Sequence, residues 1–434
     1  MQTASCAPAS RLLARRLDEL AGVTDEPGKL TRTFLSPAMR QANALVGKWM
    51  RAAGLAVRED ALGNLIGRAE GPGPGSPTLL LGSHLDTVRD AGRFDGALGV
   101  LLPIVALDEL RRRGVTLPYA VEVLGFSEEE GVRFSSAYLG SKGYAGKLRA
   151  SDLARRDANG ITVGEAIKGH GGLRAQAKRG TGFQPVLSTN TGKGARATSH
   201  PSPLLGYFEV HIEQGPVLEA EKLAVGVVSA IAGQTRGRLT FRGRAGHAGT
   251  TPMQLRRDAL AGAAELILFA EELARRRPPL VATVGSLAVA PGVPNVIPGE
   301  VVLSLDVRHP RDAARRAALR RLLAQARAIA RRRKLGCAWQ VTQDDGAVAC
   351  APRLATVLIR SVRAVQGRSL RLPSGAGHDA IVMAGLAPVA MLFVRCRGGL
   401  SHHPDEFASR ADLEVALRVT LDFLERLGAG ALRP

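Results

Sequence analysis

A histidine and two aspartates follow a short apolar run early in the chain. Residues 79–81 are all leucine, which predicts a buried strand. His84, Asp86 and Asp95 come after it, among glycines that permit tight turns. Imidazole and carboxylate groups are ligands for zinc and manganese, and Asp86 is placed to hold the second ring nitrogen of His84. One His-x-Asp alone is more typical of an ordinary polar loop, so a metal site needs further ligands from elsewhere in the chain.

Three later stretches could supply those ligands, and each follows a predicted strand. Residues 128–130 are three glutamates, whose charges repel one another unless a cation lies nearby. His211 lies at the end of another strand, and residues 401–406 follow a further one. A solvated acidic turn, a core histidine and a plain loop are the ordinary alternatives. Together the stretches place His, Asp, Glu, His and His after four strands, as a dinuclear site requires. Two ions about 3.5–4 Å apart would share a carboxylate, and a free glutamate would act as the general base.

The elements that must position these residues alternate between strands and helices. Helices are predicted over residues 10–22 and 37–54, and a helix over 100–110 separates the strands at 79–81 and 120–126. This order predicts an α/β fold, with a mixed-sheet catalytic domain that carries helices on both faces. In such sheets the ligands gather at the carboxyl ends of the strands.

A second module interrupts this domain. Residues 228–346 are predicted to form an inserted two-layer α+β domain, which leaves residues 1–227 and 347–434 to the catalytic domain. The expected elements around and within the insert are a hairpin over 225–242, a helix over 253–275, strands over 281–289 and 301–308, and an arginine-rich helix over 311–334.

Two further stretches are informative, one before His211 and one around it. Residues 169–203 are polar and rich in glycine, which predicts a flexible insertion in which His170 and His200 would make poor ligands. Alternation over residues 207–216 predicts a strand that presents His211 and Glu213 on one side.

The composition is that of an ordinary globular protein with an unusual charge. Hydrophobic residues make up 45% of the chain, and no apolar run is long enough to span a membrane. The four cysteines form no Cys-x-x-Cys pair and the first twenty residues lack the apolar centre of a secretory signal. We therefore expect a cytoplasmic protein without a thiolate zinc site.

The net charge of +20 could indicate a nucleic-acid binder, but the arginines are dispersed and no aromatic residues interleave with them. We expect no nucleic-acid partner and no membrane contact, and a basic surface that helps to collect anionic substrates.

Seven motifs connect the candidate residues. They are Gly-Ser-His-Leu-Asp-Thr-Val (82–88), Gly-Arg-Phe-Asp-Gly-Ala-Leu-Gly-Val (92–100), Glu-Glu-Gly-Val-Arg-Phe (129–134), His-Ile-Glu-Gln-Gly-Pro (211–216), Gly-His-Ala-Gly-Thr-Thr-Pro-Met (246–253), Ser-Gly-Ala-Gly-His-Asp-Ala (374–380) and Gly-Gly-Leu-Ser-His-His-Pro (398–404). As a set they resemble the motifs of the allantoate amidohydrolase and N-carbamoyl-L-amino-acid hydrolase family, amidohydrolases related to dinuclear metallopeptidases. The resemblance runs from about Thr31 to the C-terminus, apart from the insertion at 169–203.

The resemblance implies two divalent metal ions per subunit, Mn²⁺ or Zn²⁺, and a role for each candidate ligand. The implied ligands are His84, Asp95 and His211 for one ion, and Asp95, Glu130 and His402 for the other, with Asp95 bridging. Glu129 would be the general base that takes a proton from the attacking water. His403 stands where a different polar residue usually follows the ligand, so which histidine binds is open; the prediction is His402.

The resemblance also implies substrate contacts. In the inserted domain it matches His247, Asn295 and Arg308, and it points to Gln214 and His378 as further substrate-side residues. Arg308 suits a carboxylate because its planar fork can bind both oxygens. The family's counterpart of His247 reaches the site of a neighbouring subunit. The resemblance therefore implies a homodimer formed through the inserted domain, which would serve as lid and dimerisation domain.

Four stretches bear on the choice of substrate within the family. Residues 31–37, 126–132, 232–236 and 393–399 are closer to allantoate amidohydrolases. They favour hydrolysis of allantoate to ureidoglycine, ammonia and carbon dioxide in purine catabolism. N-carbamoyl-L-amino-acid hydrolysis is the close alternative, because both substrates are small anions with a ureido group beside a carboxylate. A dinuclear metallopeptidase is the distant alternative.

Overall fold

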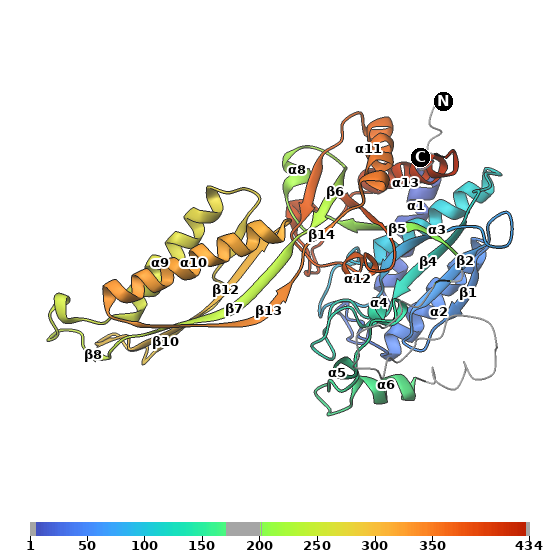
Figure 1. Cartoon of the computed structure of the whole chain (residues 1–434). Coiled ribbons are helices and arrows are strands. Elements are labelled where there is room, and N and C mark those ends of the chain that lie inside the picture. Colours follow the sequence, from blue (N-terminus) through green and yellow to red (C-terminus); the bar gives the residue numbers. More distant parts are fainter. Residues whose placement is uncertain (1–5, 171–199, 201, 431–434) are drawn as a thin grey trace. The chain divides into compact units, whose positions relative to one another are not determined.

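The computed structural model describes residues 6–170, 200 and 202–430 and divides the chain into two compact units (Figure 1). Unit 1 comprises Met1–Ser229, Cys350–Leu372 and His378–Pro434, and unit 2 comprises Ala230–Ala349 and Pro373–Gly377. Each unit has its own sheet and its own hydrophobic core. The predicted inserted domain covers residues 228–346. The long segment of unit 2 begins two residues later, at Ala230, and ends three residues later, at Ala349.

Four parallel strands form the centre of the sheet in unit 1. They lie in the order β4 (Ala120–Phe126), β3 (Thr78–His84), β5 (Leu204–Ile212) and β16 (Val389–Val394). Every residue of β3 and β4 is buried, as in the continuous apolar runs of parallel strands covered on both faces. At one edge, β2 (Leu65–Ala69) lies antiparallel to β4, and β1 (Ala56–Glu59) pairs with β2. At the other edge, β6 (Val225–Ile231) lies antiparallel to β16 and pairs with β14 (Val348–Ala349) and β15 (Arg371–Ser374). The prediction of a mixed sheet is confirmed.

Helices cover both faces of this sheet. Phe208 of β5 contacts Phe423 of α13 on one face, with ring centroids 4.6 Å apart. The neighbouring Tyr207 points the other way and contacts Phe126, which also contacts Tyr144 of α4. The helices of the first face are α1 (Ala7–Ala21), α2 (Pro37–Ala52), α3 (Ala97–Arg112), α11 (Pro352–Gln366) and α13 (Arg410–Gly428), whereas α4 (Leu139–Tyr144) and α12 (Ala380–Met383) lie on the second. Among the described residues of unit 1, the remaining short helices are α5 (Ala150–Leu153), α6 (Val163–Gly169), α8 (Val217–Ala220) and η3 (Arg397–Gly399). The predicted arrangement with helices on both faces is confirmed.

Unit 2 has two layers, an antiparallel sheet and a pair of helices. Its main sheet has the order β10 (Leu287–Ala290), β12 (Glu300–His309), β7 (Gly233–Arg242) and β13 (Gly336–Asp345), and β9 (Val281–Thr283) also pairs with β12. Buried and more exposed residues alternate along β12, so one face of the sheet packs on α9 (Ala259–Arg275) and α10 (Asp312–Arg333). A separate pair of short strands, β8 (Gly246–His247) and β11 (Val296–Ile297), lies at one end of this unit (Figure 1).

Three local predictions differ from the structure. The hairpin expected over residues 225–242 is wrong, because β6 pairs only within the sheet of unit 1 and β7 only within the sheet of unit 2. The helix expected from residue 253 begins at Ala259, because the Asp258 carboxylate accepts hydrogen bonds from the first free N–H groups and caps α9 there. The strand expected over 281–289 is two strands, β9 and β10.

The insertion expected at 169–203 lies almost entirely outside the described residues. Among the described helices, none combines the length and the apolar character needed to cross a membrane.

Candidate metal centre

The carboxyl ends of the parallel strands bring the predicted ligands to one edge of the sheet. His84 ends β3, His211 is the last but one residue of β5, and residues 128–130 follow β4. His402 follows β16 and η3, and Asp95 comes from the loop between β3 and α3. Because neighbouring parallel strands end at the same edge, side chains from distant parts of the sequence meet there.

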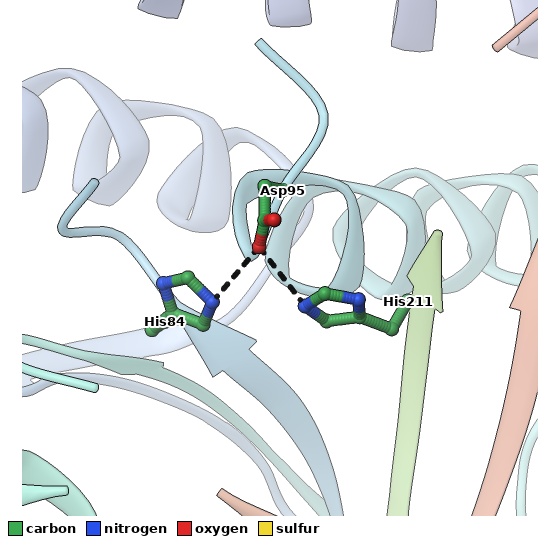
Figure 2. Close-up of side chains that lie close together, drawn as sticks. All are labelled: His84, Asp95 and His211. Carbon is green, nitrogen blue, oxygen red and sulfur yellow. Dashed lines mark ion pairs between the residues drawn. The ribbon is translucent and has the colours of Figure 1, made fainter. Parts of the chain in front are cut away.

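Asp95 lies at the centre of this cluster (Figure 2). Its Oδ1 is 3.4 Å from Nε2 of His84 and 3.2 Å from Nε2 of His211, and the two rings flank it. Its Oδ2 is 3.4 Å from Nε2 of His402, which is in turn 3.4 Å from Oε1 of Glu130. The two oxygens of one carboxylate therefore face two different groups of side chains.

These separations fit two metal ions. Ligand atoms about 2.0–2.1 Å from a tetrahedral ion are about 3.3–3.4 Å from each other. The three pairs that include Asp95, and the pair of His402 with Glu130, are 3.2–3.4 Å apart. Oδ1 of Asp95 is also buried, and its contacts with the two rings fall short of hydrogen-bond geometry. A buried carboxylate oxygen of this kind needs positive charge beside it, which protonated histidines or a metal ion can supply. Nδ1 of His403 accepts from the backbone N–H of Asp405, whereas Nε2 of His402 faces Asp95 and Glu130, so His402 is the histidine that the structure brings to the cluster.

The side chains of the cluster already balance one another's charge. Burial raises the pKa of Asp95, but His211, His402 and His84 outweigh it and hold that pKa well below its usual range. In the same way Asp95 and Glu130 raise the pKa of His402 to about 10. A divalent cation would replace the histidine protons in this role.

Glu129 lies beside the candidate ligands and has the properties of a proton acceptor. Burial raises its pKa well above the usual range; His84 opposes the shift, and Glu130 and Asp379 add to it. A carboxylate with a raised pKa can take and return a proton near neutral pH. His84, Glu129 and Glu130 also bring one ligand atom each within 4.8 Å of one another. Position alone therefore leaves the division of roles between the two glutamates open.

Asp86 connects two parts of the cluster. Its carboxylate oxygen lies 3.4 Å from Nδ1 of His84, and its backbone oxygen lies 3.0 Å from the same nitrogen. The two carboxylate oxygens also accept hydrogen bonds from the backbone N–H groups of Glu129 and Glu130, at 2.9 and 3.1 Å. These contacts fit the orienting role predicted for Asp86 and extend it to the glutamates after β4.

Two of the predicted substrate-side residues belong to this cluster as well. Nε2 of Gln214 donates to Oδ2 of Asp95 at 2.8 Å. The ring of His378 meets that of His211 edge-on, with centroids 4.6 Å apart. Burial, with the charge of His211, lowers the pKa of His378 well below its usual range, so His378 is neutral at pH 7.

Glu213 is a predicted neighbour that the structure does not bring to the cluster. The expected strand ends at Ile212, so Glu213 lies beyond it and no longer shares a side with His211. Its carboxylate instead accepts from the backbone N–H groups of Val217 and Leu218 at 2.8 and 2.9 Å and caps α8. That part of the sequence prediction is wrong.

Some supporting residues escaped the sequence analysis. Glu209 is fully buried and accepts from Oγ of Ser83 at 2.7 Å and from the N–H of Ala380 at 3.0 Å. Its position two residues before His211 on a strand was the available signal. Arg32 is also buried and donates from Nε to the carbonyl oxygen of Leu85, which holds the backbone just after His84. Nothing in the local sequence marks that contact.

The three predicted residues of unit 2 lie at opposite ends of its sheet. His247 is in β8, whose pairing with β11 places it next to Asn295. Arg308 is near the other end of β12, where Nε and Nη2 each lie 2.9 Å from the Asp306 carboxylate and Nη1 donates to the Gly375 carbonyl at 2.6 Å. A hollow of about 580 Å³ adjoins this guanidinium, and Arg236 and Arg238 also line it.

Comparison with known proteins agrees with this geometry. Residues 80–426 match the model of the peptidase family M20/M25/M40, and the chain belongs to this family. It is 40% identical over 439 residues to the allantoate deiminase of Arabidopsis thaliana, covering 94% of this chain and 81% of that one. It is 39% identical over 419 residues to an N-carbamoyl-L-amino acid amidohydrolase of Geobacillus stearothermophilus, covering 96% and 98%. A solved amidase of the hydantoinase/carbamoylase family from Burkholderia multivorans superposes with a TM-score of 0.86 at 33% identity, covering 96% and 97%.

The protein is therefore an enzyme, a hydrolase that acts on carbon–nitrogen bonds. More narrowly, it is a metal-dependent amidohydrolase, as the resemblance of its motifs implied. Enzymes of the M20 family typically depend on two metal ions, and the clusters around Asp95 offer the ligand groups for them.

The division of Asp95 between two clusters predicts the metal content of variants. Wild-type protein should bind about two Mn²⁺ or Zn²⁺ ions per chain, His402→Ala about one, and Asp95→Ala about none, because only Asp95 serves both groups. Metal analysis after equilibrium dialysis measures this. Glu213→Gln is the control, since that glutamate lies outside the clusters, and it should retain both ions. Equal metal content in wild type and Asp95→Ala would contradict the shared carboxylate.

Proposed function

We propose that this enzyme hydrolyses a ureido carbon–nitrogen bond, and that its substrate is allantoate, which it converts to ureidoglycine, ammonia and carbon dioxide. The observation that carries the proposal is the Asp95 carboxylate, whose two oxygens face two ligand groups with Glu129 alongside. Bound Mn²⁺ or Zn²⁺ ions would polarise the attacking water and the substrate carbonyl. The implied ligands are His84, Asp95 and His211 for one ion and Asp95, Glu130 and His402 for the other.

Glu129 is the proposed general base. Its carboxylate takes a proton from water as the water attacks the ureido carbon, and returns the proton to the nitrogen that leaves. The support is its raised pKa and the hydrogen bond from its backbone to Asp86, which holds the residue at the edge of the cluster. His378, neutral and buried against His211, is suited to donate a hydrogen bond to the substrate.

The substrate carboxylate is assigned to Arg308. Arg236 and Arg238 line the same hollow as Arg308, and Asp306 is the single acidic residue of its lining, so the lining carries a net positive charge that suits an anion. Both allantoate and N-carbamoyl-L-amino acids have the carboxylate that this hollow would bind. The stretches at 31–37, 126–132, 232–236 and 393–399 favour allantoate. N-carbamoyl-L-amino-acid hydrolysis is the alternative, supported by relatives of that name at similar identity.

We assign the functional unit to a homodimer formed through unit 2, with His247 serving the partner's site. In the register of the sheet, Arg242 pairs with Glu300 and Gln234 pairs with Arg308. His247 and Asn295 lie beyond the Glu300 end, so about 26 Å of strand or more separates them from Arg308. A small substrate bound by Arg308 cannot reach across that length to His247 of the same chain, which supports a contribution from a second subunit. We further propose that the enzyme serves purine-nitrogen recovery in the cytoplasm.

Substrate preference tests the proposal directly. We expect kcat/KM on Mn²⁺-loaded protein to be at least about tenfold higher for allantoate than for any of a panel of N-carbamoyl-L-amino acids, a difference of about 1.4 kcal/mol in transition-state binding. A chelator should abolish turnover of both. The reverse order of kcat/KM would establish the alternative, and full activity of metal-free protein would exclude both.

Replacing the general base should separate chemistry from metal binding. Glu129→Gln is expected to keep both ions and to lose about 10²–10⁴-fold in kcat, because the amide cannot accept the proton. Glu130→Gln should instead lose metal. Metal content and steady-state kinetics measure the two effects. Loss of an ion from Glu129→Gln but not from Glu130→Gln would reverse the two roles.

A shared site predicts complementation between inactive variants. In a heterodimer of His247→Ala and Glu129→Gln chains, one of the two sites regains both wild-type residues. Random exchange of equal amounts should therefore restore about a quarter of wild-type activity. The control is each variant exchanged with itself, which should stay inactive. Heterodimers detected by mass spectrometry without recovered activity would contradict the contribution in trans.

A further inference from the structure

We propose that Glu406 is a positioning residue for the metal centre: it fixes the loop that presents Asp95 and ties it to the loop that carries His402. The inference rests on the proposed function, because it concerns the ligand groups assigned there. Glu406 touches none of the expected substrate or reacting atoms. Its side chain acts through Asp95 and Ser401, and its backbone N–H acts through the turn after His402.

The hydrogen bonds of the Glu406 side chain lead to Asp95. Its side chain is only 3% exposed. Oε1 accepts hydrogen bonds from the backbone N–H groups of Phe94 and Asp95, at 2.8 and 3.1 Å. Oγ of Ser401 lies 3.2 Å from Oε2 of Glu406 and donates to Oδ2 of Asp95 at 2.6 Å. Glu406 therefore holds the backbone of Asp95 directly, and it lies beside the hydroxyl group that donates to the Asp95 carboxylate.

Two glycines allow this loop to be held so closely. A Cβ atom on Gly92 would lie 2.3–2.5 Å from atoms of the Glu406 side chain, so only glycine leaves room for the carboxylate. On the other side of Asp95, a Cβ atom on Gly96 would lie 2.3–2.5 Å from the His84 ring, and Gly96 has φ +64°. The loop is thus held between Glu406 on one side and the ligand His84 on the other.

The same residue orders the loop of the second ligand group. The N–H of Glu406 donates to the carbonyl of His403 at 3.0 Å and closes a turn just after His402. His402 itself has φ +56°, a conformation that is uncommon in residues other than glycine. Because Glu406 bonds to this turn and to the Asp95 backbone, it sets the distance between two ligands that are far apart in the sequence.

Such a role predicts a loss of metal affinity when the hydrogen bonds are removed. Outer partners of metal ligands typically contribute 10–100-fold in metal affinity or activity. Glu406→Ala removes the acceptor for two backbone N–H groups, and Gly92→Ala displaces the carboxylate without removing it. Glu406→Gln retains an oxygen for both N–H groups, and its amide can still meet Ser401.

A hollow beside Glu406 offers a second test. About 350 Å³ of space in unit 1 is lined by Glu406 together with Arg93, Arg397 and Phe407. In Glu406→Ala, formate can enter from this hollow and place a carboxylate where the side chain was removed. Recovery by formate would show that the hydrogen-bonding group matters, since a defect in packing alone would not respond to a small anion.

The experiment is calorimetric titration of metal-stripped protein with Mn²⁺ or Zn²⁺, followed by metal analysis and steady-state kinetics. We expect Glu406→Ala and Gly92→Ala each to weaken metal binding at least about tenfold, and the double variant to lose little more, because both act through one contact. Glu406→Gln should stay within about threefold of wild type in metal affinity and KM. The matched control is Asp258→Ala, which removes a carboxylate that also accepts from two backbone N–H groups but lies in unit 2. It should lower the thermal stability of the protein and leave metal affinity unchanged.

The outcomes separate this inference from the proposed function. Wild-type protein that binds no metal would refute the proposed function itself. If wild type binds two ions and both Glu406→Ala and Gly92→Ala bind them equally tightly, only the positioning role of Glu406 is overturned. The role is overturned as well if formate restores no affinity to Glu406→Ala at concentrations that leave wild type unaffected. Thermal unfolding of the metal-free variants shows that each is folded, and Gly92→Ala and Glu406→Gln carry the test should Glu406→Ala fail to fold.

Discussion

The shared carboxylate of Asp95 is the constraint on which the rest of unit 1 depends. One side chain must direct Oδ1 toward His84 and His211 and Oδ2 toward His402, so its backbone has almost no freedom. It is also buried, and a buried carboxylate is stable only beside positive charge or hydrogen-bond donors. The histidines and the donors Gln214 and Ser401 meet that need, which is why the pKa of Asp95 stays low in a buried position.

The fold meets this constraint with a rigid sheet and with loops that hydrogen bonds hold in place. Four parallel strands end at one edge and deliver His84, His211 and the glutamates from positions fixed by backbone pairing. Asp95 and His402 come from loops instead, where pairing gives no support. Asp86 and Glu406 replace that support with side-chain acceptors for backbone N–H groups. Buried carboxylates thus have two roles at this edge. Some are candidate ligands, and others accept hydrogen bonds from the loops that carry candidate ligands.

Unit 2 carries much of the positive charge of the chain. Residues 230–349 contain 20 of the 59 lysines and arginines but only 9 of the 39 aspartates and glutamates, so the excess of positive charge is concentrated there. A basic unit with a hollow lined by three arginines suits an anionic substrate, and the field of such a unit raises the rate at which anions arrive. The charge that might have suggested a nucleic-acid partner thus has a use within the proposed reaction.

The sequence alone determined the class of fold, the strands of the central sheet and the local motifs at their ends, because apolar runs and glycine-rich turns act over a few residues. It also indicated His84, Asp95, Glu130, His211 and His402 through their motifs. Only the tertiary structure decided how they meet, that His402 rather than His403 faces Asp95, and that Glu213 caps a helix. It alone revealed Arg32, Glu209 and Glu406 as supports, and that residues 225–242 leave one sheet for another. The physical reason is that hydrogen bonds such as that of Glu406 to Asp95 join residues more than 300 positions apart. No local pattern records which distant backbone group a buried carboxylate will meet.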